Sequence, residues 1–125
     1  MWLAIVGYRN FNDYDKFCKM INYIQLKFPE KMEKVVGIVS GEAPGVDQLA
    51  KRWAAEKNLL YEGFPADWSL GKRAGPIRNR KIVDKMDFMI ALPKVEPDGS
   101  YSKGTKNSIE LAKKSKKVCY IIEIQ

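Results

Sequence analysis

The stretch VVGIVSGEAPGVDQLAKRWAA, residues 35–55, decides the fold of this chain, because it joins a buried strand to an amphipathic helix through a glycine-rich loop. Residues 35–39 form a short apolar run, which is typical of a strand covered on both faces. The apolar face of the helix that follows is formed by Val46, Leu49, Ala50, Trp53 and Ala54. A strand, a glycine loop and a helix in this order predict one unit of a parallel sheet.

The same alternation of strand and helix runs through the rest of the chain. Strands are predicted at residues 3–6, 35–39, 59–64, 88–92 and 118–124. Helices are predicted from about residue 14 to 28, capped by Asn12 or Asp13, and then over residues 46–54, 75–85 and 105–115. We therefore expect one α/β domain over residues 1–125, a three-layer α/β/α sandwich whose parallel five-stranded sheet has the order 3-2-1-4-5.

The composition narrows the chemistry of the chain. It has 22 Lys and Arg against 15 Asp and Glu, and the net charge of +7 favours anionic or phosphorylated ligands. The absence of histidine excludes Ser-His-Asp and Cys-His catalysis and histidine metal sites. Cys18 and Cys119 lie among apolar residues and are predicted to pack in the core. With no charged leader and no apolar stretch near about 20 residues, we expect a soluble cytoplasmic protein without a membrane partner.

Four glycine-bearing loops follow the predicted strands. In a parallel sheet of this order, all four emerge at the carboxyl edge, where the ligand crevice of such folds lies. Glycines, arginines and the starts of three helices would meet there, and free backbone N–H groups at helix starts favour phosphate. The candidate ligand-binding residues are Gly7, Arg9, Ser40, Gly41, Gly45, Asp47, Arg78, Asn79, Gly104 and Thr105.

Several of these residues also have simpler interpretations. Arg9 by itself is equally typical of an exposed surface arginine, and Asp47 of a carboxylate matched to the helix dipole rather than a partner of ribose or Mg²⁺. Trp68, just after the third strand, either stacks on a base or is buried over the sheet edge. The lysines between residues 113 and 117 indicate a solvated helix end more than a nucleic-acid patch.

Five segments together resemble one known family. They are GYRNFND (7–13), SGEAPGVD (40–47), PADW (65–68), GKRAGPIRNR (71–80) and KGT (103–105). They are similar to YspA-type members of the SLOG superfamily, which is named for the DNA-processing protein DprA (Smf) and the cytokinin-activating Lonely Guy enzymes. The resemblance runs from Gly7 to about Val118. It implies a Rossmann-like fold, a nucleotide or nucleotide-derived ligand, and a homodimer.

The resemblance leaves three functions open. The first is a nucleotide-binding sensor or regulatory module, which requires no cofactor and no metal site, although a bound nucleotide and Mg²⁺ are compatible with it. The second is an N-glycosidase acting on nucleoside 5′-monophosphates, with Asp47 or Asp67 as candidate catalytic carboxylates. Lonely Guy enzymes use a glutamate three residues after a Gly-Thr pair, where this chain has Ser108, and Glu110 is turned to another side of the helix. The third, binding of single-stranded nucleic acid as in DprA, ranks last because few aromatic residues could form a stacking platform.

Overall fold

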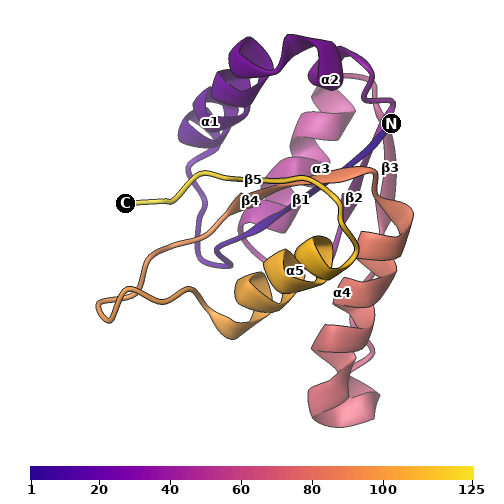
Figure 1. Cartoon of the computed structure of the whole chain (residues 1–125), viewed down its shortest axis with the longest axis vertical. Coiled ribbons are helices and arrows are strands. Elements are labelled where there is room, and N and C mark those ends of the chain that lie inside the picture. Colours follow the sequence, from indigo (N-terminus) through magenta and orange to yellow (C-terminus); the bar gives the residue numbers. More distant parts are fainter.

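The computed structural model describes all 125 residues and contains one five-stranded sheet (Figure 1). Its strands are β1 (Trp2–Gly7), β2 (Gly37–Ser40), β3 (Leu60–Gly63), β4 (Phe88–Leu92) and β5 (Cys119–Ile121). They lie in the order β3-β2-β1-β4-β5, and every neighbouring pair is parallel. The predicted Rossmann-like α/β class and strand order are confirmed.

Helices cover both faces of the sheet. One face carries α1 (Tyr14–Lys27), α2 (Pro29–Glu33) and α3 (Val46–Glu56), and the other carries α4 (Ala74–Lys85) and α5 (Lys103–Lys114) (Figure 1). The strands serve both layers because successive side chains point to opposite faces. In β1, Leu3 and Ile5 pack against α1–α3, whereas Ala4 and Val6 pack against α4 and α5.

Individual side chains also settle several predictions. Asp13, rather than Asn12, caps α1, because its carboxylate accepts the N–H of Lys16 at 3.0 Å. Trp53 is buried in the α1–α3 layer as predicted. Cys18 and Cys119 are free and only partly buried, each packed against one of the two apolar clusters. No helix combines the length and the apolar character that crossing a membrane requires.

Some predicted boundaries are wrong. The short helix α2 begins at Pro29, where only the end of α1 was expected, because proline at the first helical position gives up no hydrogen bond. Two short 3₁₀ turns with a kink at Gly71 (φ 70°, ψ −142°) between them, together labelled η1 (Trp68–Arg73), occupy the segment before α4, and α4 begins at Ala74 instead of residue 75. Helix α5 begins at Lys103, two residues earlier than predicted.

Three strands are shorter than the apolar runs that predicted them, because pairing and not hydropathy sets their ends. Strand β2 begins at Gly37, which lies opposite Trp2, the first residue of β1. Strand β3 pairs with β2 through four residues only. Strand β5, at the edge, pairs through three residues with β4, so residues 118–124 are not all strand.

The lysine-rich end of α5 is only partly a solvated face. The ammonium group of Lys117 donates to the carbonyl oxygens of Val83 at 2.6 Å and Met86 at 2.9 Å. These carbonyls lie at the carboxyl end of α4, where backbone oxygens lack helical partners and attract positive charge. Lys117 therefore joins the start of β5 to the end of α4.

We expect Lys117→Met to lower the free energy of unfolding by about 1–2 kcal/mol, because it leaves these carbonyls without their charged donor. Urea denaturation at pH 7 would measure the change. Lys114→Met is the matched control, since the side chain of Lys114 is exposed and makes no hydrogen bond, and the variant should stay within about 0.5 kcal/mol of the parent. Equal effects of the two substitutions would contradict the interaction.

Candidate functional site

A cavity of about 720 Å³ lies at the carboxyl edge of the sheet, and we call it the rim cavity. Its lining comes from the loops after β1, β2, β3 and β4, together with Asp47 of α3, η1, α4 and the first turns of α5. Its volume falls within the range of small-molecule sites, about 300–1,000 Å³. It lies beside the end of β1, the strand at which the winding direction of the sheet changes.

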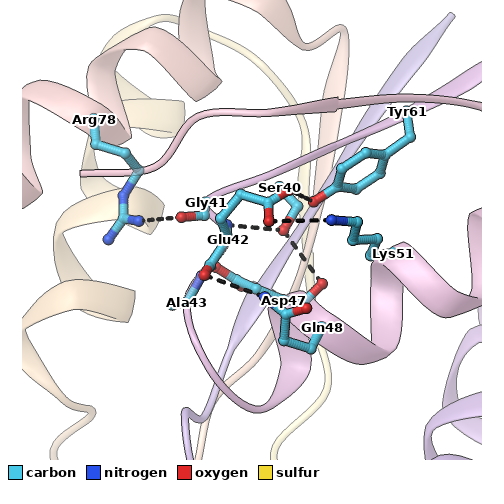
Figure 2. Close-up of polar contacts among 9 residues, drawn as sticks. All are labelled: Ser40, Gly41, Glu42, Ala43, Asp47, Gln48, Lys51, Tyr61 and Arg78. Carbon is cyan, nitrogen blue, oxygen red and sulfur yellow. Dashed lines mark hydrogen bonds and ion pairs between the residues drawn. The ribbon is translucent and has the colours of Figure 1, made fainter. Parts of the chain in front are cut away.

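The loop after β2 is held in a fixed shape by Glu42 (Figure 2). Glu42 has a positive φ of 60°, which is uncommon outside glycine. Its carboxylate accepts a hydrogen bond from the Tyr61 hydroxyl and forms an ion pair with Lys51 at 3.4 Å. Burial and the bond to Glu42 raise the pKa of Tyr61, so its hydroxyl remains a donor. These contacts offset the backbone strain and keep the loop open toward the cavity.

Asp47 places a buried carboxyl group at the floor of the rim cavity. It lies in the first turn of α3, is only 6% exposed, and accepts the N–H of Ala43 at 3.2 Å. Burial raises the pKa of Asp47 to about 6, although the N–H of Ala43 and the charge of Arg78 partly oppose this. The group is therefore mostly ionised at pH 7 and becomes protonated in mildly acidic solution.

Arg78 reaches across from α4 to the loop after β2 (Figure 2). Its Nη1 donates to the carbonyl oxygen of Gly41 at 2.6 Å, and its Nε donates to Oδ1 of Asn79 at 2.8 Å. A side chain on Gly41 has no room, because its Cβ would lie 2.6 Å from Nη1 of Arg78 and 2.9 Å from Oδ2 of Asp47. The Nη2 group of Arg78 makes no hydrogen bond within the chain and remains available to a ligand.

A second guanidinium group faces the same cavity. Arg9, in the loop after β1, is exposed and forms neither a hydrogen bond nor an ion pair. Burial lowers the pKa of Arg78, the Asp47 carboxylate opposes the shift, and the positive charge of Arg9 adds to it. Two guanidinium groups that line one cavity without an ion pair favour a bound anion there.

Asn79 connects α4 to α5. It is 5% exposed, and its Nδ2 donates to Oδ1 of Asn107 at 2.9 Å and to the carbonyl of Gly104 at 3.4 Å. Its own Oδ1 accepts from Arg78. Because all these atoms already have protein partners, the geometry favours a role for Asn79 in positioning Arg78. Ser108 lies on α5 one turn after Gly104 and is 3% exposed. It lines the cavity, and its hydroxyl has no hydrogen-bond partner in the chain.

The structure brings most of the predicted site residues together. Those that line the rim cavity are Gly7, Arg9, Gly41, Asp47, Arg78, Asn79, Gly104 and Thr105. Gly104 and Thr105 lie inside the first turn of α5, and Ser102 occupies the capping position. The role of each residue in binding stays a prediction.

Three predicted residues lie outside the lining. Ser40 is buried, and its hydroxyl donates to the backbone carbonyl of Asp47 at 3.3 Å. Gly45 packs beneath the loop after β1. Asp67 caps η1: its carboxylate accepts the hydroxyl of Ser69 at 2.6 Å and the N–H of Ser69 at 3.1 Å, and these hydrogen bonds lower its pKa. Ser40 and Gly45 therefore shape the loop after β2. The carboxylate of Asp67 is hydrogen-bonded to Ser69 and does not line the cavity.

Other lining residues were missed. They include Tyr8, Lys72, Glu96, Lys103 and Asn107. The sequence could have indicated Asn107, because it lies one helical turn after Lys103 and therefore on the same face of the helix. Arg80, two residues after Arg78, is exposed and does not line the cavity, because two residues turn a helix through about 200°. No three acidic or cysteine side chains approach closely enough to hold a metal ion.

The parallel sheet, the helices on both faces and the cavity at its carboxyl edge define a Rossmann-like domain of the kind that binds nucleotides or nucleic acids. The sequence profile of the YspA, cpYpsA-related SLOG family matches residues 1–71, more than half of the chain. The chain belongs to this family.

A solved structure shares the fold. It is that of DNA processing protein A from Helicobacter pylori, described in terms of that protein's single-stranded DNA binding mode. The TM-score is 0.62 and the sequence identity 21%, over 100% of this chain. The chain spans 66% of the length of that protein. No protein in a search of curated sequences matches the chain significantly.

Proposed function

We propose that the chain binds a phosphorylated, nucleotide-derived small molecule in the rim cavity and acts as a sensor or regulatory module. One observation carries the proposal: Arg9 and Arg78 face one cavity, and neither forms an ion pair. Guanidinium groups without an ion pair are stabilised by a phosphate, which accepts several charge-assisted hydrogen bonds at once.

The other groups at the rim suit the rest of such a ligand. The first turn of α5 presents N–H groups without helical partners, and Ser108 adds a free hydroxyl. The carboxylate of Asp47 is an acceptor for a sugar hydroxyl. No cofactor is needed for this binding, and the lack of a carboxylate cluster means that Mg²⁺ would enter through the phosphates of the ligand.

We expect at least one member of a nucleotide panel to raise the melting temperature of the protein by mass action. The panel contains nucleoside 5′-monophosphates, 3′,5′-cyclic nucleotides and ADP-ribose. Arg9→Gln should weaken binding at least about tenfold, because a charge-assisted hydrogen bond contributes about 1.5–3 kcal/mol. Thermal shift and calorimetric titration would measure both effects.

Arg80→Gln is the matched control, since Arg80 is exposed on α4 outside the cavity. It should bind like the parent protein, whereas Arg78→Gln should weaken binding at least as much as Arg9→Gln does. A thermal shift of undiminished size in both cavity variants would overturn the assignment of the site.

A hydrolase is the second candidate, favoured by Asp47. A carboxyl group with a pKa of about 6 inside a cavity is suited to general acid catalysis near neutral pH. Asp67, the other carboxylate considered, caps η1 and does not line the cavity. Release of free base from a nucleoside 5′-monophosphate, abolished by Asp47→Asn, would support this function, and prolonged incubation without release would reject it for that substrate.

Binding of single-stranded DNA is the third candidate. It is favoured by the structural likeness to DNA processing protein A and by the net charge of +7. Contacts to a DNA backbone predict an affinity that falls steeply with added salt. Binding of a single nucleotide with a weak dependence on salt would instead favour the leading proposal.

A further inference from the structure

Trp68 is a large aromatic residue with no partner in the chain. It is 67% exposed, although it lines the rim cavity. The other two tryptophans are engaged: Trp53 is buried in the core, and Trp2 lies under the ammonium group of Lys85. Trp68 takes part in no aromatic pair and no cation–π contact. Its indole is therefore left open beside the cavity.

Two observations place Trp68 beside the cavity. Asp67 caps η1 through the N–H and the hydroxyl of Ser69, which holds the 3₁₀ turn that begins at Trp68. The edge of the ring lies over the first turn of α4, where it would meet a Cβ on Gly75 at 4.0 Å. Because the cap holds the backbone at Trp68, a ligand that stacks on the ring has only the rotations of the side chain to restrict.

The lining changes in character along the cavity. The lining residues Pro65 and Ala66, just before Trp68, and Gly75 and Pro76, at the start of α4, carry no charge, whereas Lys72 between them does. The positive charge comes from two other segments: Arg9 lies in the loop after β1, and Arg78 lies in the second turn of α4. The cavity thus offers a flat apolar surface at one part and positive charge at another, as an aromatic base and a phosphate on one ligand require.

We infer that Trp68 stacks on the base of the ligand, and that the site selects nucleotides carrying an aromatic base over sugar phosphates and inorganic phosphate. This inference rests on the proposed function. Stacking of a base on an aromatic side chain is sequence-tolerant, because every base has a π-face. Trp68 therefore favours a base as such, and the choice among bases falls to other residues of the cavity.

The test compares the panel nucleotides with ribose 5-phosphate, which is a nucleoside 5′-monophosphate without its base, by calorimetric titration. We expect the best nucleotide to bind at least about tenfold more tightly than ribose 5-phosphate in the parent protein. Trp68→Ala should reduce this preference to about threefold or less, and Trp68→Phe should keep most of it. Because Trp68 is exposed, Trp68→Ala should keep the melting temperature of the unliganded protein, and binding of ribose 5-phosphate should be unchanged.

Other results would overturn the inference in distinguishable ways. If Trp68→Ala keeps the preference, or if ribose 5-phosphate binds as tightly as any nucleotide and is lost in Arg9→Gln, the stacking role fails and the proposed function stands. If neither ribose 5-phosphate nor any nucleotide binds, both fail. Leu70 and Ile77 are also exposed near Trp68, so a dimer that dissociates in Trp68→Ala with an unchanged preference would assign the ring to an interface between copies.

Discussion

Replacing Asp47 by asparagine should change how the stability of the protein depends on pH. Burial raises the pKa of Asp47 from 3.8 in the unfolded chain to about 6, so the folded state binds the proton more tightly. Stability therefore falls as the pH rises through the interval between these values, and above pH 6 the ionised group costs about 3 kcal/mol. The variant lacks this loss. Its free energy of unfolding, relative to the parent, should rise by about 2 kcal/mol between pH 4.5 and pH 7.5.

Urea denaturation of both proteins at the two pH values measures this change, and all other titrating groups cancel in the difference. Asp67→Asn provides the control, because hydrogen bonds from Ser69 lower the pKa of this exposed carboxylate instead of raising it. Its difference from the parent should not rise over the same interval. If the difference in the free energy of unfolding between Asp47→Asn and the parent is the same at both pH values, the carboxyl group is solvated in the folded protein.

Gly45→Ala should lower the free energy of unfolding by more than about 3 kcal/mol. Gly45 has φ 79° and ψ −130°, a conformation that disfavours side chains. A Cβ there would also overlap the backbone of Tyr8 and Arg9, which cannot move aside as a flexible side chain could. The same displacement should remove Arg9 from the rim cavity and abolish nucleotide binding.

Gly99→Ala separates the two causes of this loss. Gly99 also has a positive φ, of 85°, but a Cβ there would meet no atom within 4 Å. It should therefore cost only the backbone strain, about 1 kcal/mol, and leave binding unchanged. Chemical denaturation of the two variants measures both values. Similar losses would mean that the packing between the loops after β1 and β2 is not tight.

The arrangement of the sheet could be predicted because it depends on pattern and topology. The sequence has five apolar runs with helical segments between them. Because connections between parallel strands are right-handed, only a few strand orders are possible for such a chain, and the observed order is the expected one. The first and last residues of the helices and strands were predicted less accurately than the order of the strands. The sequence before α4 contains glycine and polar residues typical of a loop, and the cap formed by Asp67 explains only the first turn of η1, before the kink at Gly71.

For the candidate site, too, one part could be predicted from the sequence and another could not. Its location follows from the rule that loops at the carboxyl ends of parallel strands meet, and eight of the predicted residues line the rim cavity. Which atoms stay free depends on side-chain contacts between distant segments. Asn79 is occupied by Asn107 on α5, and the exposure of Trp68, which the sequence left undecided, follows from the path of η1.

The most direct measurement is a titration of ¹⁵N-labelled protein with each panel nucleotide, followed by amide chemical shifts. Binding at the rim predicts shift changes at residues 41–43 and 104–108 and at the Trp68 indole N–H. A second, lysine-lined cavity of about 430 Å³ at the α1–α2 junction, which includes Lys27 and Lys31, serves as the internal control and should show none. Changes confined to that second cavity, or no change with any nucleotide, would contradict a nucleotide site at the rim.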